Sequence, residues 1–177
     1  MIKSDIDEET QQTGEDPYAY VRRLSIEKAD AVSARLTEPS LVLAADTVVI
    51  LAADTIGVTD GGVILGKPAD TDEARDMLRR LRGRDHVVCT ALTLRRIDPQ
   101  AQQTITELTR TIVTMRDYSD AEIDAYIATG DPFDKAGGYA IQHDGFHPVE
   151  RIDGSYSNVV GLPVETLKEM LRRIGYS

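Results

Sequence analysis

The residues best suited to chemistry in this chain are two aspartates, Asp46 and Asp54, each within an Ala-Asp-Thr tripeptide that ends a hydrophobic run. A carboxylate at the end of a buried strand is costly unless it meets a cation or a proton-transfer partner, so each aspartate is a candidate for a functional site. Both copies precede a Gly-Lys-Pro sequence within Leu43–Asp70. The repeat leaves open which aspartate would act as a catalytic base.

Two lysines lie in segments that could bring them to a ligand. Lys67 stands between a glycine, which permits close backbone approach, and a proline, which stiffens the chain. Lys135 lies within Asp131–Gln142, DPFDKAGGYAIQ, where two glycines precede an expected short strand that ends at Gln142, whose amide could bind a base or a ribose. A turn, a surface ion pair and a surface amide explain each feature singly. Together they fit a polyphosphate ligand with a polar head better than they fit packing.

A third lysine, Lys28, lies on the apolar face of an expected helix that opens at Pro17 and ends near Leu36. Apolar residues at helical spacing define that face, and Lys28 follows Val21 by seven residues. Such a lysine either extends from the edge of the stripe to solvent or directs its charge into a site. The pattern leaves both interpretations open.

The remaining elements alternate between the two periodicities, which indicates an α/β or α+β fold with a mixed sheet. The expected order is a buried strand from Leu41, a hairpin turn at Thr59–Gly62, a helix capped by Asp70 and ended by Gly83, strands His86–Arg95 and about Ile105–Met115, a helix capped by Ser119 and Glu122, a loop system over Asp131–Asn158, and a terminal helix opened by Pro163 with Val164 facing inward.

Composition limits the possible partners and compartment. The chain has 177 residues with 20 basic and 30 acidic side chains, and its net charge of −10 repels nucleic acid and anionic membrane. An anionic substrate therefore needs a local cluster of lysines or a divalent metal. Cys89 is the single cysteine, so a disulfide framework is excluded and a reduced, cytoplasmic setting fits best. The start lacks the pattern of a secretory signal, and no apolar run reaches membrane-spanning length.

Familiar catalytic motifs are missing from the sequence. It contains no Walker loop, no GxGxxG after a strand, no HExxH and no GxSxG. The three histidines, His86, His143 and His147, are too scattered for a metal triad, and we interpret each as a structural or surface residue.

Six segments taken in order resemble the Maf family of nucleoside triphosphate pyrophosphatases. They read SDIDEE, RLSIEKADAV, LVLAADTVV, GKPADTDEARDMLRRLRGRDHVV, GDPFDKAGGYAIQ and GSYSNVVGLP, from about Ser4 to the C-terminal helix. The resemblance implies one Maf-like domain over residues 1–177, with an elongated mixed sheet, flanking helices and a cleft between two lobes. It also implies hydrolysis of a nucleoside triphosphate to the monophosphate and pyrophosphate, and it is compatible with a homodimer.

The resemblance also implies roles for individual residues. The aspartate of Ala-Asp-Thr would act as general base or metal ligand, with Glu8 as a metal ligand and Lys28 and Lys67 around the phosphates. A divalent cation, Mg²⁺ or Mn²⁺, would assist. Thr47 and Gln142 resemble the pair found in the branch of the family that prefers dTTP and UTP.

The sequence departs from the family pattern at its start. The family opens with a strand and a phosphate-binding Ser-x-Ser-Pro-Arg-Arg loop, and this sequence starts after them. We therefore expect weak or no turnover from these 177 residues. The alternative to an enzyme is a nucleotide-binding or regulatory module that keeps the cleft but has lost catalysis.

Spacing does not decide between the two aspartates. Asp46 lies 46 − 28 = 18 residues after Lys28, and Asp54 lies 67 − 54 = 13 residues before Lys67, both close to the family pattern. The other two spacings, 54 − 28 = 26 and 67 − 46 = 21, are stretched, which indicates an insertion of eight residues. Asp46 follows the run that matches the family best, and we prefer it; Asp54 leaves the following hairpin at its usual length.

Overall fold

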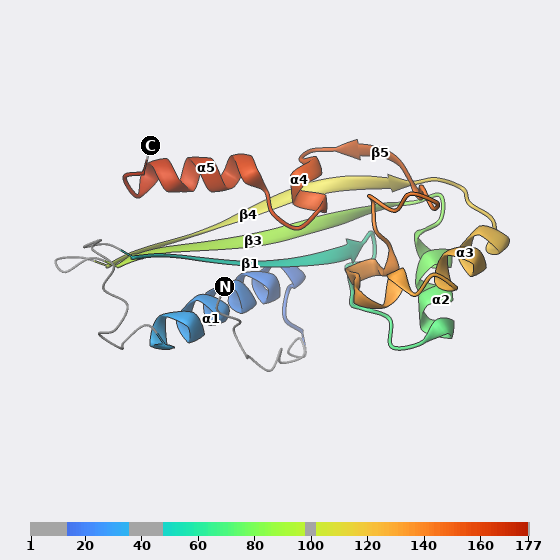
Figure 1. Cartoon of the computed structure of the whole chain (residues 1–177), viewed down its shortest axis with the longest axis horizontal. Helices are drawn as coiled ribbons and strands as arrows, with labels where there is room; N and C mark the ends of the chain where they lie inside the picture. Colours follow the sequence, from blue (N-terminus) through green and yellow to red (C-terminus); the bar gives the residue numbers. More distant parts are fainter. Residues whose placement is uncertain (1–13, 36–47, 98–101, 177) are drawn as a thin grey trace. The chain divides into compact units, whose positions relative to one another are not determined.

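The structure is a computed structural model that describes residues 14–35, 48–97 and 102–176. Helices and strands alternate along the chain (Figure 1). The helices are α1 (Pro17–Arg35), α2 (Thr71–Leu81), α3 (Asp120–Ile127), α4 (Tyr156–Val159) and α5 (Val164–Arg173), with two 3-10 turns, η2 (Asp131–Asp134) and η3 (Ala136–Gly138). The strands are β1 (Val48–Thr59), β2 (Ile64–Leu65), β3 (Asp85–Ile97), β4 (Gln102–Met115) and β5 (Val149–Asp153). Among these helices, none is long and apolar enough to cross a membrane.

The described strands form one five-stranded sheet in the order β2-β1-β3-β4-β5. The hairpin expected at Thr59–Gly62 pairs β1 with β2 in antiparallel register, with Gly57 opposite Leu65. β5 pairs antiparallel with β4 at the other edge of the sheet. The α/β class with helices flanking a sheet is therefore confirmed, and these pairings are more regular than the mixed sheet that we expected.

The chain divides into two compact units. Unit 1 comprises residues 1–54, 90–109 and 163–177, and unit 2 comprises residues 55–89 and 110–162. The long strands β1, β3 and β4 contribute residues to both units. A single domain over residues 1–177 stays a prediction.

In unit 1 the two helices cover opposite faces of the sheet. Leu92 and Leu94 of β3 are buried against Met170 of α5. Thr93 between them points to the other face, where its Oγ1 lies 2.8 Å from the hydroxyl of Ser25 on α1. Because successive strand residues alternate between faces, α5 packs on one side and α1 on the other.

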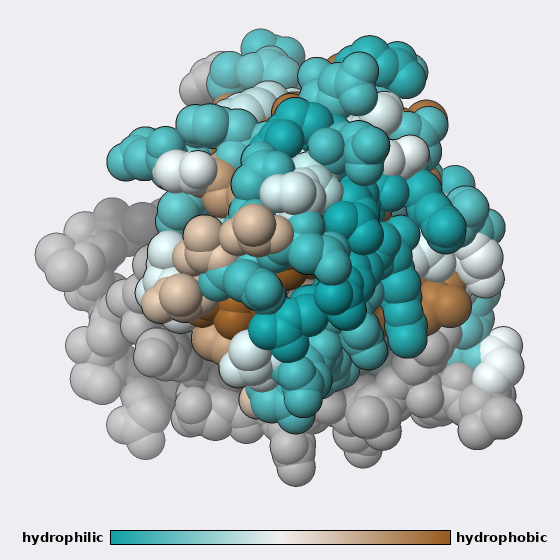
Figure 2. Space-filling model, turned by 90° about the vertical axis from the view of Figure 1, so that its right-hand side faces the viewer, coloured by the Kyte–Doolittle hydropathy of each residue, from teal (hydrophilic) through white to brown (hydrophobic). Residues whose placement is uncertain are grey.

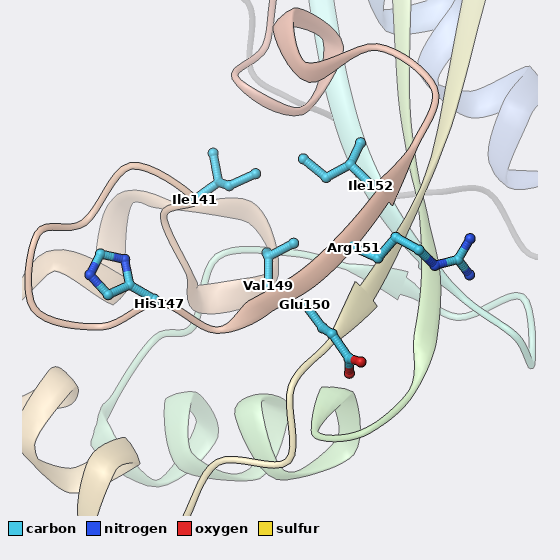
Figure 3. Close-up of a pocket in the computed structure, with 6 residues that line it drawn as sticks. All are labelled: Ile141, His147, Val149, Glu150, Arg151 and Ile152. Atoms are coloured by element: carbon cyan, nitrogen blue, oxygen red, sulfur yellow. The ribbon is translucent and has the colours of Figure 1, made fainter.

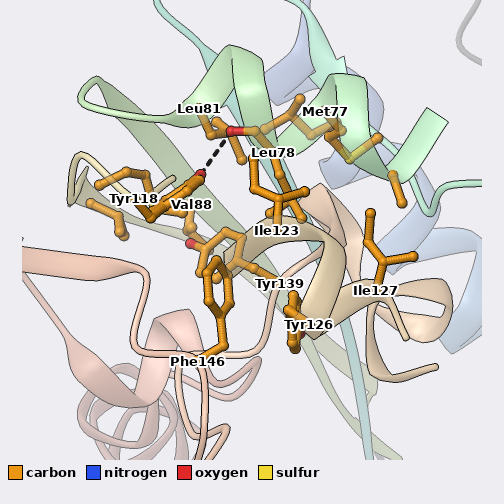
Figure 4. Packing of buried hydrophobic residues seen from close by; sticks show 14 residues of the cluster. Met77, Leu78, Leu81, Val88, Tyr118, Ile123, Tyr126, Ile127, Tyr139 and Phe146 are labelled. Carbon is orange, nitrogen blue, oxygen red and sulfur yellow. Dashed lines mark hydrogen bonds between the residues drawn. The ribbon is translucent and has the colours of Figure 1, made fainter. Parts of the chain in front are cut away.

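Unit 2 has its own hydrophobic core between α2, α3 and the sheet (Figure 4). The apolar stripe expected on α2 is confirmed, since Leu78 and Leu81 are fully buried. Tyr118 donates a hydrogen bond of 2.7 Å from its hydroxyl to the backbone oxygen of Leu78, which satisfies the one polar atom of the buried ring. The rings of Tyr126 and Phe146 stack with centroids 4.4 Å apart.

The helix starts follow the expected capping pattern. Asp70 accepts a hydrogen bond from the backbone nitrogen of Glu73, and Ser119 with Glu122 forms a complete capping box. The backbone hydrogen bond from Ser119, together with the guanidinium of Arg116, lowers the pKa of Glu122 to about 2. These local signals therefore decided where α2 and α3 begin.

The outward faces of α2 and α3 are polar. Arg75 and Arg79 of α2 form ion pairs with Asp124 and Asp120 of α3, at 2.8 and 2.7 Å. The view that looks onto this end of the molecule is mostly hydrophilic, with a small hydrophobic group near its middle (Figure 2). Both helices thus turn their apolar stripes inward and join their solvent-facing sides by charge.

Three local expectations are wrong. The segment Asp131–Asn158 is not loop throughout, because it contains β5 and most of α4. Tyr139–Gln142 is not a strand but leads into a turn, and Val164 is 37% exposed rather than inward. Short elements carry too few residues for periodicity, so tertiary contacts decide them. The part of the expected first strand before Val48 lies outside the described residues.

Candidate functional site

An ion pair between α1 and β1 forms the first part of the candidate site. Ala53 packs toward α5, so strand alternation turns the neighbouring Asp54 toward α1. There Lys28 lies 2.5 Å from Asp54, between Nζ and Oδ1. The two side chains are only 17% and 13% exposed. Lys28 therefore directs its charge into unit 1, at a carboxylate, instead of extending to solvent.

A pair of this kind is costly to bury. Taking both charges out of water is compensated only when the geometry and further hydrogen bonds are good, so such pairs are weak evidence for stability. A shielded carboxylate beside an ammonium group can accept a proton from water or bind a cation, and the ammonium can bind an anion. The arrangement thus suits chemistry on a charged ligand.

Unit 2 brings together the two other lysine-bearing segments. The backbone nitrogen of Gly137 donates a 3.0 Å hydrogen bond to the oxygen of Gly66, next to Lys67. Lys135 forms an ion pair with Asp134. Its hydrogen bond, with a weaker contribution from the charge of Lys67, lowers the pKa of the Asp134 carboxyl. The segments around Gly-Lys-Pro and Asp-Lys-Ala-Gly-Gly therefore lie side by side, with both ammonium groups near one carboxylate.

Glycine is needed for this close approach. Gly137 and Gly138 have φ angles of +81° and +68°, which L side chains rarely adopt. A Cβ atom at Gly138 would lie 3.5 Å from the sulfur of Met77 and 3.7 Å from Pro68. The paired glycines thus let the second segment pass closely over the first.

A buried histidine supports this segment from below. His86 Nε2 lies 2.8 Å from the hydroxyl of Tyr139, directly after the two glycines. His86 is 2% exposed, and its Nδ1 has no hydrogen-bond partner among the described residues. Burial lowers the pKa of His86 to about 4, so the ring is neutral near pH 7. The interpretation of His86 as structural fits this position, which no feature of the sequence links to Tyr139.

The side chain of Gln142 is exposed and lies in a turn. Next to it, Ile141 lines a shallow groove of about 310 Å³ that the other lining residues complete: His147, Val149, Glu150, Arg151 and Ile152. Figure 3 shows the side chains of Ile141, Val149 and Ile152 directed toward a common space, while Glu150 and Arg151 point away. Of the residues expected in the active site, none lines this groove.

Three of the expected site residues, Glu8, Asp46 and Thr47, lie outside the described residues. Within residues 14–35, 48–97 and 102–176, no group of three or more acidic, histidine or cysteine side chains could hold a metal ion. The structure thus describes two parts of the expected set, Lys28 with Asp54 in unit 1 and Lys67 with Lys135 in unit 2.

Comparison with known proteins identifies the family to which these motifs belong. The family model described as Maf-like protein matches residues 1–174. The chain belongs to the Maf family. The match includes every described residue of the two lysine clusters and Gln142, so the resemblance based on six motifs is confirmed over almost the whole chain.

Curated relatives carry one common description. The chain is 44% identical over 174 residues to the dTTP/UTP pyrophosphatase of Syntrophus aciditrophicus, covering 96% of this chain and 78% of that protein. It is 47% identical over 163 residues to the dTTP/UTP pyrophosphatase of Anaeromyxobacter dehalogenans, covering 92% and 77%. The enzyme of the same description from Shewanella oneidensis is 44% identical over 177 residues, covering 99% and 84%.

Proposed function

We propose that this Maf-family chain is a nucleoside triphosphate pyrophosphatase that hydrolyses dTTP and UTP to the monophosphate and pyrophosphate. The observation that carries the proposal is the buried pair of Lys28 and Asp54, 2.5 Å apart, within a chain of this family. The relatives described as dTTP/UTP pyrophosphatases support the substrate class.

The reaction needs a base at the attacking water. The water oxygen forms a bond to the α-phosphorus, the bond from that phosphorus to the oxygen bridging to the β-phosphorus breaks, and the electron pair leaves with pyrophosphate. Asp54 accepts the proton that the water loses, which is the work of a general base. Its position beside Lys28 favours Asp54 over Asp46 for this role.

Charge on the leaving group needs cations, which the −10 chain must gather locally. Lys67 and Lys135 bind oxygens of the β- and γ-phosphates, because their segments lie side by side in unit 2 and carry two ammonium groups. Lys28 balances the charge of Asp54 when substrate is absent and binds phosphate oxygen when substrate is present.

A divalent cation belongs to the same proposal. Carboxylate oxygens are the ligands that Mg²⁺ and Mn²⁺ prefer, and Asp54 with Glu8 would supply them. Asp46 offers the same donor atoms if it takes the place of Asp54. When bound, such a cation neutralises charge on the phosphate oxygens.

The preference for thymine and uracil is assigned to Thr47 and Gln142. An exposed amide carries both a donor and an acceptor, which matches the alternating edge of a pyrimidine base. We also assign the protein to the cytoplasm, since its one cysteine, Cys89, is buried as a free thiol.

The test is the identity of the products. The purified chain with Mg²⁺ or Mn²⁺ is incubated with dTTP, UTP, dATP and GTP, and phosphate and pyrophosphate are measured separately. We expect pyrophosphate and monophosphate from dTTP and UTP, faster than from the purine nucleotides. Release of single phosphate, or equal rates with all four nucleotides, would contradict the proposal.

The impaired alternative makes a different prediction in the same experiment. A chain that binds dTTP in titration calorimetry without releasing pyrophosphate is a binding module. Joining the family's strand and Ser-x-Ser-Pro-Arg-Arg loop to Met1 then tests the cause, because turnover by the joined chain assigns the deficit to the phosphate-binding loop.

A further inference from the structure

β5 is an outer strand of the described sheet. The strand order ends at β5, which is bonded to β4 on one side only (Figure 1). Outer strands present a row of backbone donors and acceptors that can pair with another chain. Glu150, Arg151 and Asp153 of β5 are exposed, whereas Val149 and Ile152 are half-buried.

A bulge sorts these side chains onto two faces. Val113 lies opposite Ile152 and Met115 opposite Val149, with the irregularity at Thr114 and Met115 leaving Glu150 as the extra residue. Directly opposed residues of an antiparallel pair share a face. Val149 and Ile152 therefore both lie on the side of the buried Val113 and Met115, where the groove of about 310 Å³ opens.

The opposite face of β5 is charged. Arg151 lies opposite Thr114 and Asp153 opposite Ile112, which is 41% exposed. β5 thus has an apolar face that carries Ile152 and a charged face that carries one arginine and one aspartate, two positions apart.

This order of residues is complementary to itself. If two copies of β5 pair antiparallel about a two-fold axis at Ile152, the two Ile152 side chains meet on the groove face and each Arg151 lies opposite Asp153 of the other copy. An axis at Arg151 instead opposes two arginines, and an axis at Glu150 opposes two glutamates. Of these three registers, only the first places unlike charges opposite each other.

We propose that the chain forms a homodimer in which β5 of one copy pairs with β5 of the other in this register. The paired sheets continue from one copy into the next, and the second Ile152 covers the apolar side of the groove. The interface contains residues of unit 2 alone. A strand of five residues is short, so the dimer is weak and its population depends on concentration.

Sedimentation of the full chain over about 1 to about 500 μM measures that population. We expect a reversible shift from monomer to dimer, with amides of Arg151, Ile152 and Asp153 exchanging hydrogen more slowly at high concentration. A chain that stays monomeric at every concentration overturns the proposal, as does a dimer whose β5 amides exchange at the same rate throughout.

Charge reversal tests the register. Arg151→Asp and Asp153→Arg each place like charges opposite each other and are expected to weaken dimerisation by tenfold or more, that is, about 1.4 kcal/mol. The double variant with both substitutions restores the pairs and the dimer, which excludes misfolding as the cause. Arg84→Asp, an exposed arginine of unit 2 away from β5, serves as the matched control. Equal dimerisation by both single variants, or no recovery in the double variant, would refute this register.

Discussion

At the level of single residues, burial distinguishes Lys28 from the other lysines of the site. Lys28 reaches a carboxylate within its own unit, whereas Lys67 is exposed and Lys135 is 35% exposed beside two aspartates. Position on the helix stripe was the one clue in the sequence, and it left two interpretations open. The contact with Asp54 depends on β1 lying beneath α1, which helix periodicity alone does not specify.

The exposed lysines are expected to serve binding and not stability. Lys67→Ala and Lys135→Ala should each weaken binding of dTTP roughly tenfold, because each removes a charge-assisted hydrogen bond. The melting temperature should stay unchanged, since exposed ion pairs stabilise little. Titration calorimetry and thermal unfolding measure the two quantities. Lys168→Ala is the control, because this lysine pairs with Glu165 on α5; a loss of affinity equal to that control would remove both lysines from the site.

His86 is expected to make stability depend on pH. Its pKa is lowered from 6.5 to about 4 by burial, so between these values the unfolded chain takes up a proton that the folded chain does not. The free energy of unfolding should therefore fall by up to about 3 kcal/mol as the pH drops from about 6.5 to about 4, and this contribution should change no further below that.

Urea unfolding at several pH values isolates that contribution when His86→Gln is compared with the parent chain. The variant should lose this part of the pH dependence, whereas His147→Gln, at an exposed position, should keep it. Parallel pH profiles of the parent chain and His86→Gln would show that His86 titrates normally.

At the level of elements, the sequence was most informative where one local rule decides the outcome. Capping residues placed the starts of α2 and α3, and the four buried positions of α2 follow its helical stripe. β5 and α4 were missed because five and four residues carry no readable period. Their positions depend on contacts such as Asn158, whose Nδ2 donates to the oxygen of Val88 at 3.0 Å, and no local pattern encodes a partner 70 residues away.

The turn between β5 and α4 requires glycine. Gly154 has a φ of +129°, and a Cβ atom there would lie 3.0 Å from Thr111 Oγ1 and 3.1 Å from its Cα. Thr111 Oγ1 also accepts a 2.9 Å hydrogen bond from Asn158 Nδ2, so it has little freedom to move.

Gly154→Ala should therefore lower the free energy of unfolding by roughly 2 kcal/mol, through strain and the close contact. Gly61→Ala is the control, because its nearest neighbour is 3.8 Å away and its φ is not positive, and it should change stability by less than about 0.5 kcal/mol. Denaturant unfolding gives both values. Equal stability of the two variants would mean that the turn relaxes around a side chain.

At the level of the whole molecule, motif order carried further than any single motif. Six short segments in sequence indicated the family, and the family model matches residues 1–174. The same reasoning could not choose between Asp46 and Asp54, since an eight-residue repeat gives each one plausible spacing. Geometry adds what spacing lacks, because only a folded chain shows which carboxylate meets Lys28. Among the described residues that carboxylate is Asp54.

The most direct test of this assignment is the rate of pyrophosphate release from dTTP by Asp54→Asn and Asp46→Asn, each in the chain joined to the family's phosphate-binding loop. Loss of the base should slow Asp54→Asn by about 100-fold or more, whereas Asp46→Asn should stay close to the parent rate. Full activity in Asp54→Asn with loss in Asp46→Asn would transfer the role to Asp46. Equal activity in both variants would contradict the catalytic assignment as a whole.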